Sequence, residues 1–206
     1  MYRAANNSTK GLPSGRTRIS ARILVLLGIV LLVSGLPQSA RAQSTADEYQ
    51  VKAAFLFHFA QFLDWPAGAL SAGGSSVSLC IFDDEPHRQE LQSTIENKPI
   101  GDKVFHVHLI TKAQEIQGCN ILFLSRDEAR RQTAILKSLR GLPVLTVGET
   151  NEFLSDGGMI RFHLEDGKIR FDINLEPADS AHLKISSRLL LLATSVTRGA
   201  AGDRGR

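Results

Sequence analysis

After residue 76 the chain alternates between short apolar runs and segments with the apolar spacing of helices. Strands are predicted at 77–82, 104–110, 119–124 and 143–147, and helices at 86–95 and 125–139. We expect Ser125 to cap the second of these helices, with Glu128 completing a capping box. Because strands that alternate with helices connect by right-handed crossovers, the pattern predicts an α/β fold. Its central sheet should be largely parallel, with helices on both faces.

Two later apolar runs, 159–164 and 169–175, flank Asp166-Gly167, the strongest hairpin-turn signal in the chain. A two-residue turn there fixes the register of an antiparallel hairpin added to the sheet. The expected cross-strand pairs are Glu165–Lys168, Leu164–Ile169, His163–Arg170, Phe162–Phe171, Arg161–Asp172 and Ile160–Ile173. In this register apolar residues meet on one face and two pairs of opposite charge meet on the other, so both faces are satisfied together.

Residues 47–63 predict an aromatic-rich helix ahead of the sheet. Asp47 and Glu48 are expected in its first turn, where the helix dipole favours negative charge, and Pro66 is expected to end it. Apolar residues cover most of its circumference, including Phe55, Phe59, Phe62, Leu56 and Leu63. Such a helix is either packed into the core on several sides or partly covered by a second chain, and the pattern favours core packing.

The C-terminal part predicts two short helices and a tail. One helix is expected after Pro177, and a last helix is expected to be capped by Ser186 or Ser187. The apolar stripe of this last helix is formed by Leu189, Leu192 and Ala193. Residues 198–206 contain three glycines and no large apolar residue, which is typical of a disordered tail. We therefore expect a single domain of residues 43–197.

The first 42 residues have the features of a cleaved export signal. Basic residues precede an apolar run that begins at Ile23 and reaches Leu36, about 21 Å as a helix. This is shorter than the roughly 30 Å hydrocarbon core of a bilayer. The small-x-small sequence Ala40-Arg41-Ala42 predicts cleavage after Ala42, leaving Gln43 as the new N-terminus of an exported, periplasmic protein. An uncleaved anchor and a mitochondrial transit peptide are the alternatives.

The charge of the chain is unevenly distributed. The 206 residues carry 24 basic and 21 acidic side chains, but six basic and no acidic residues precede Gln43. The rest of the chain therefore has 18 basic and 21 acidic side chains. A nucleic-acid binder of this size normally has a basic folded part, so this class is excluded.

The two cysteines, Cys80 and Cys119, are expected to form a disulfide. Both lie on apolar segments that resemble central strands, and an oxidising compartment favours the bridge over two free thiols. Neither cysteine has a second Cys or a His at ligand spacing, so no metal site is predicted there.

Polar residues follow three of the predicted parallel strands. They are Asp83, Asp84 and Glu85, then Ser125 and Arg126, then Gly148 and Glu149. Ligands bind open α/β sheets outside the carboxyl ends of their strands, so these residues are candidates for one crevice. The alternative is that loops at this edge are polar in any case and that helix starts favour acidic residues.

The polar face of the hairpin is a second candidate surface. Arg161, His163 and Arg170 gather there beside Asp172, and they either bind a ligand or form a solvated face. His106 and His108 share one face of a strand but have no third ligand in sequence, so we predict no metal. We find neither a glycine-rich phosphate loop nor a nucleophile elbow, so we predict no cofactor and no catalytic residues.

Several sequence blocks, spread over most of the expected domain, resemble the YfiR-like family of periplasmic proteins. The first blocks are Tyr49, the run 51–56, Phe59 and Trp65-Pro66. The later blocks are 141–148, 157–160, 168–174 and 183–187, followed by Leu189-Leu190 and Ala193. The order and spacing of the blocks are consistent with the family.

The resemblance implies a regulator that works by protein contact. In the family's best-known system the protein represses a membrane-bound diguanylate cyclase through the cyclase's periplasmic part, which lowers cyclic di-GMP and biofilm formation. An outer-membrane lipoprotein can sequester this repressor. By this resemblance we expect a regulator that forms a homodimer. Because the aromatic-rich first helix has more apolar face than a single core needs, we expect it to contact the partner. The alternative is a periplasmic sensor that binds a small ligand at the strand-end crevice or on the hairpin face.

Overall fold

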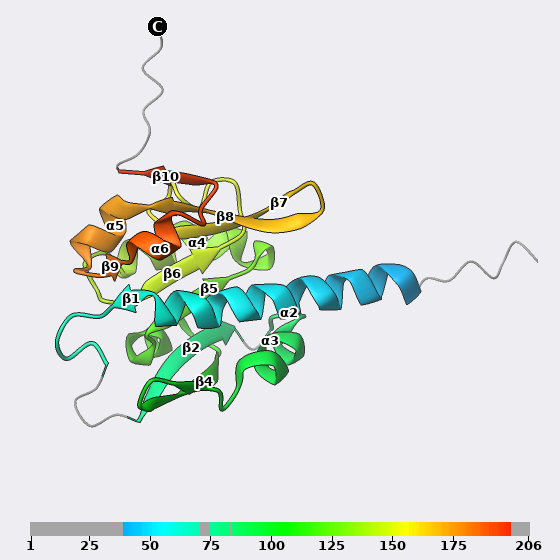
Figure 1. Cartoon of the computed structure of the whole chain (residues 1–206), viewed down its shortest axis with the longest axis horizontal. Helices are drawn as coiled ribbons and strands as arrows, with labels where there is room; N and C mark the ends of the chain where they lie inside the picture. The colour runs from blue at the N-terminus through cyan, green and yellow to red at the C-terminus, as the bar shows by residue number, and fades with distance from the viewer. Residues whose placement is uncertain (1–38, 71–74, 83, 199–206) are drawn as a thin grey trace, which may run out of the picture. The chain divides into compact units, whose positions relative to one another are not determined.

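The computed structural model describes residues 39–70, 75–82 and 84–198, with side chains from residue 46 onward (Figure 1). The expected leader lies almost entirely outside these residues, as do candidate residue Asp83 and nearly all of the expected tail. Ala42 and Gln43, which flank the expected cleavage site, lie within the first described helix. The described part from residue 41 onward belongs to one unit of the chain.

Five α-helices and two 3-10 helices are described. The α-helices are α2 (Ser39–Gln61), α3 (Arg88–Ile95), α4 (Ala129–Ser138), α5 (Leu175–Ser180) and α6 (Ser187–Leu190). The 3-10 helices are η1 (Ala113–Gly118) and η2 (Arg126–Glu128).

Ten strands are described in the same part of the chain. The first five are β1 (Leu63–Asp64), β2 (Ser76–Phe82), β3 (Pro99–Ile100), β4 (Lys103–Ile110) and β5 (Ile121–Leu124). The others are β6 (Leu145–Gly148), β7 (Ile160–Glu165), β8 (Lys168–Asn174), β9 (Lys184–Ile185) and β10 (Ser195–Thr197).

The main sheet has eight strands in the order β10-β8-β7-β6-β5-β2-β4-β3. Strands β4, β2, β5, β6 and β7 are parallel, while β8 runs antiparallel to β7 and β3 antiparallel to β4. A separate small sheet pairs β1 with β9. The α/β class, the largely parallel sheet and the added antiparallel hairpin are therefore confirmed.

The hairpin register is confirmed at all six predicted pairs, from Glu165–Lys168 at the turn to Ile160–Ile173. Asp166 and Gly167 have φ angles of 50° and 71°. Positive φ at both central residues is what a tight hairpin turn needs to match the twist of its strands. The sequence Asp-Gly accepts this conformation at little cost, which is why the turn lies here and not one residue away.

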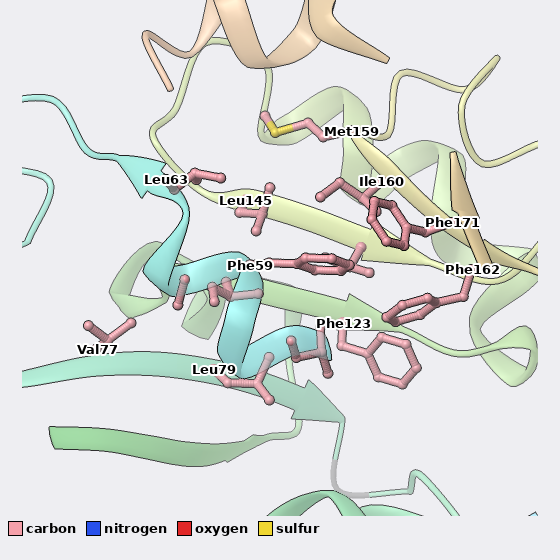
Figure 2. Packing of buried hydrophobic residues seen from close by; sticks show 14 of the residues in the cluster. Phe59, Leu63, Val77, Leu79, Phe123, Leu145, Met159, Ile160, Phe162 and Phe171 are labelled. Atoms are coloured by element: carbon pink, nitrogen blue, oxygen red, sulfur yellow. The ribbon is translucent and has the colours of Figure 1, made fainter. Parts of the chain in front are cut away.

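Helices cover both faces of the sheet because its central strands are apolar on both sides. One cluster joins α2 and α3 to alternate residues of the strands, and a second joins α4 and η1 to the residues between them. Figure 2 shows Phe59 of α2 pointing toward Phe162 and Phe171 of the hairpin. Its ring centroid lies 5.6 Å and 5.0 Å from theirs. The expectation that the aromatic helix packs into the core is thus confirmed.

Several predicted boundaries were wrong. Helix α2 begins at Ser39, so Asp47 and Glu48 lie in its interior and not in its first turn. It also ends at Gln61, well before Pro66, because the chain turns there to pair Leu63 with Ile185. Local signals for a helix start could not reveal an earlier start, since residues 39–46 contain no helix breaker.

The predicted cap at Ser125 was also wrong. Its side chain makes no cap hydrogen bond, and a 3-10 turn separates it from α4. Helix α5 contains Pro177 at its third position, where a missing N–H costs little because first-turn N–H groups have no partner within the helix. At the last helix, the expectation for Ser186 is confirmed, since its side chain accepts a hydrogen bond from the Leu189 N–H.

Candidate functional site

The carboxyl ends of β2, β5 and β6 bring Glu85, Ser125 and Glu149 together. All three are at least nine-tenths buried. They are close enough for Ser125 and Glu149 to affect the pKa of Glu85. Parallel strands end at the same edge, so three polar side chains that are far apart in sequence converge there. The convergence of polar side chains that we expected for a ligand crevice is therefore present.

The edge is nevertheless filled by α2. The ammonium of Lys52 lies 2.5 Å from Glu149 Oε1 and 2.5 Å from Glu48 Oε1. The contact with Glu149 Oε1 is ionic, because its geometry is not that of a regular hydrogen bond. Tyr49 donates its hydroxyl to Glu149 Oε2 at 3.3 Å, and its ring stacks on His87 at 3.9 Å. The chain's own helix thus supplies the cation and the hydrogen-bond donor that a ligand would have brought.

Burial shifts the pKa of two groups in this cluster, Tyr49 and Glu85. It raises the pKa of the Tyr49 phenol far above its usual range, and the nearby carboxylates of Glu149 and Glu85 raise it further. Burial also raises the pKa of Glu85, although the nearby Ser125 hydroxyl and the hydrogen bond from the His87 N–H oppose this. The charge of Glu149 adds to the increase. Lys52 is thus in direct contact with the buried carboxylate of Glu149 and the partly exposed carboxylate of Glu48.

The Glu85 carboxylate should make stability depend on pH. Because its folded pKa is raised, Glu85 stabilises the fold most below the usual pKa of a glutamate, and this contribution is lost as pH rises through the folded pKa. We expect Glu85→Gln to raise the free energy of unfolding at pH 7 and to lose this advantage near pH 4. The Gln side chain keeps an oxygen for the His87 N–H, which Glu85 Oε1 now accepts at 3.1 Å.

Urea unfolding of both proteins at the two pH values checks this expectation. Glu152→Gln is the matched control. Because Glu152 is exposed, this substitution should leave the free energy of unfolding nearly unchanged at both pH values. A Glu85→Gln protein that is less stable than wild type by the same amount at both pH values would contradict the buried-charge account.

Of the other strand-end candidates, Asp84 lies apart from this cluster and Arg126 lies at its edge. Asp84 is exposed and contacts the Arg131 guanidinium, 3.0 Å from its Oδ1, and this guanidinium also pairs with Glu128. The contacts of Arg131 tie the loop after β2 to α4, which accounts for Asp84 without a ligand. Arg126 is exposed in η2 and lines a small pocket together with Lys52, Glu149 and His163.

The hairpin face is organised around one buried carboxylate. Arg161 lies 2.6 Å from Asp172 Oδ2, and His163 Nδ1 lies 3.3 Å from the same oxygen. The Ser195 hydroxyl donates to the other carboxylate oxygen at 2.7 Å. Asp172 therefore joins β7, β8 and β10, while Arg170 is exposed and lies 3.7 Å from Glu165. Arg161 and His163 are used within the fold.

The comparison with known families decides the identity of the chain. The sequence profile described as YfiR/HmsC-like matches residues 49–194, which is most of the chain. The chain belongs to the YfiR/HmsC-like family. The matched range begins at Tyr49 and thus includes Lys52 and the rest of the buried cluster.

Two solved structures also resemble this YfiR/HmsC-like chain. One is a conserved domain protein of Vibrio cholerae O1 biovar El Tor, at 10% identity and a TM-score of 0.43, covering 63% of this chain and 57% of that one. The other is the ABC domain from Streptococcus pneumonia in complex with L-Trp, at 10% identity and a TM-score of 0.47, covering 72% and 60%. The chain spans less than two thirds of either protein's length, and likenesses at these scores carry no argument about function.

The residues that sequence reasoning missed in this YfiR/HmsC-like chain are Tyr49 and Lys52. A lysine and a tyrosine three positions apart on a largely apolar helix were the available signal, because a buried cation needs a buried anion. Within the described ranges, no group of three or more His, Cys, Asp or Glu residues is placed to hold a metal ion. His106 instead contacts Glu96, with Nδ1 2.7 Å from Oε1. No helix in the described part is long and apolar enough to cross a membrane.

Proposed function

We propose that the mature chain is a periplasmic repressor that binds the periplasmic part of an inner-membrane diguanylate cyclase. Contact would hold the cyclase inactive and lower cyclic di-GMP. Membership of the YfiR/HmsC-like family over residues 49–194 carries this proposal. The export signal predicted in residues 1–42 supports the compartment. The occupied strand-end crevice supports a role in protein contact rather than catalysis, since its polar groups are bound by α2.

The contact surface expected on α2 needs correction. Phe55, Phe57 and Phe62 are half-buried and pack against the main core cluster. The side of the helix that faces solvent is mostly polar, with Val51 as its exposed large apolar side chain. The aromatic residues of α2 are thus used within the fold, and the helix is a poor candidate for the anchoring surface.

We place the contact at the C-terminal edge of the sheet. Leu191 and Leu192 are 85% and 62% exposed, and Val196 in β10 is also exposed. Strand β10 pairs with β8 on one side and is the last strand of the sheet (Figure 1). Exposed leucines beside an edge strand combine an apolar anchor with backbone groups that accept a partner strand.

Deletion of the gene tests the repressor role. Cyclic di-GMP and surface attachment should both rise, and they should fall again when the cognate cyclase is also removed. Unchanged levels in the deletion strain would reject the repressor proposal.

A surface variant tests the docking edge separately. Leu191→Ser together with Leu192→Ser should reproduce the deletion while leaving the thermal unfolding temperature unchanged, since both side chains are already in water. Leu164→Ser is the matched control and should keep wild-type repression, because Leu164 is an exposed leucine near the hairpin turn, beyond the residues of β8 that pair with β10. If the double variant represses normally while the deletion does not, the edge is wrong and the repressor role stands.

The proposal extends to two further contacts. A homodimer is expected from the resemblance. Size-exclusion chromatography of wild type and of the same double variant shows whether Leu191 and Leu192 contribute to the dimer interface. An outer-membrane lipoprotein that sequesters the repressor is expected as the opposing partner.

A further inference from the structure

A cavity of about 320 Å³ lies between the C-terminal end of α4, the loop before β7 and α5. Its floor includes Thr146 of β6 and Asn174 of β8. Leu145 and Val147 pack in the cluster of α2, so Thr146 between them points to the opposite face of the sheet. The cavity therefore lies on the opposite face of the sheet from the strand-end cluster. Asp172 lies two residues before Asn174 on β8 and shares its face, but it does not line the cavity.

The size and walls of the cavity suit a small organic molecule. Leu136 of α4 and Leu139, directly after its last residue, form one wall, and Leu154 and Met159 line another part. Small-molecule sites usually have volumes of about 300–1,000 Å³, with mostly apolar walls and a few polar groups that fix orientation. The cavity lies at the lower end of this range.

The polar groups of the floor have donor capacity left over. The Thr146 oxygen accepts a hydrogen bond from the Met159 N–H at 3.1 Å, so its own hydrogen remains available. Asn174 accepts from the Glu176 N–H at 3.2 Å and donates one amide hydrogen to the Leu154 carbonyl at 3.3 Å. Its second amide hydrogen has no acceptor within the described residues. Both side chains are at least nine-tenths buried, where an unused donor is costly.

The charged residue Arg140 lies at the mouth of the cavity and is exposed. Donors without acceptors and a guanidinium together favour an acceptor group with negative charge. We propose that this cavity binds a small carboxylate with an apolar aliphatic or aromatic body. Glu176 also lines the cavity, and its charge should oppose the ligand and so weaken binding. The inference does not depend on the repressor role.

Calorimetric titration of the purified protein with phenylacetate and hexanoate tests the proposal. Both carboxylates should bind, with amide shifts in the nuclear magnetic resonance spectrum at Gly141 and Gly157, which line the cavity. Phenylacetamide, which has the same body without the charge, should bind at least about tenfold more weakly, as expected for loss of a charge-assisted hydrogen bond. Arg140→Gln should weaken the binding of phenylacetate by about the same factor, and Glu176→Gln should strengthen this binding.

A blocking variant keeps the test independent of charge. Ser180 is exposed at the cavity and donates its hydroxyl to the Glu176 carbonyl one helical turn earlier, so Ser180→Trp should fill the mouth and abolish binding. Ser138→Trp is the matched control, since Ser138 on α4 makes the same kind of bond but does not line the cavity. No binding of either carboxylate, shifts confined to other regions, equal binding of the amide, or weaker binding by Glu176→Gln would each overturn the proposal.

Discussion

Lys52→Met should lower the free energy of unfolding by about 3–5 kcal/mol, because it removes one partner of a buried ion pair. The Lys52 side chain is 5% exposed, and that of Glu149 is 3% exposed. Without the ammonium, the Glu149 carboxylate keeps only the Tyr49 hydroxyl at 3.3 Å and stays close to Glu85. The lost cation also lay over the Tyr49 ring, 4.0 Å from its centroid. Urea unfolding at pH 7 measures the loss.

A double variant separates the unpaired charge from the loss of packing. Lys52→Met with Glu149→Gln removes both charges and should recover most of the stability, since an apolar or neutral pair of similar volume replaces a buried ion pair at little cost. Lys168→Met, on the exposed hairpin turn, should leave stability within about 0.5 kcal/mol. If the double variant is as unstable as Lys52→Met alone, Lys52 acts through packing and the ionic account of the cluster is wrong.

Local sequence patterns predicted the fold correctly where they were compatible with only one arrangement of strands and turns. The hairpin was placed residue by residue because Asp166-Gly167 and the alternation of 160–173 agree on a single register. The parallel strands were found because each is a buried apolar run between polar loops. Strands β1, β3, β9 and β10 were missed because they have two or three residues, too few for periodicity to show. The pairings of β1 with β9 and of β10 with β8 also depend on partners that are distant in sequence. Beside β1, for example, the Phe62 carbonyl accepts a hydrogen bond from the Ser186 N–H.

The candidate site was predicted only in part. Topology alone brings Glu85, Ser125 and Glu149 to one edge, so the alternation of strands and helices was enough to group them. It could not show that α2 closes this edge, because nothing local to Lys52 indicates which carboxylate it meets 97 residues later. The cavity near Thr146 was likewise invisible, since α4, the loop before β7 and α5 form it from three separate segments.

Removal of the disulfide should have an effect of similar size to loss of the ion pair. Cys80 in β2 is joined to Cys119, which lies just before β5 and not within it as the sequence suggested. Their Cα atoms are 5.8 Å apart, within the usual range for a bridge, and 39 positions separate them in sequence. Closing a loop of this length stabilises the fold by about 4 kcal/mol through the unfolded chain.

We therefore expect the variant Cys80→Ala with Cys119→Ala to lose about 2–5 kcal/mol in urea unfolding. Both positions are buried beside Phe82 and Leu122, so alanine avoids placing a hydroxyl in this cluster. Wild-type protein treated with a reductant is the internal control and should match the double variant, because both lack the same constraint on the unfolded chain. Thiol titration of the denatured, unreduced protein should find no free thiol. Two free thiols per chain would show that the bridge does not form. A double variant as stable as wild type would show that the bridge does not stabilise the fold.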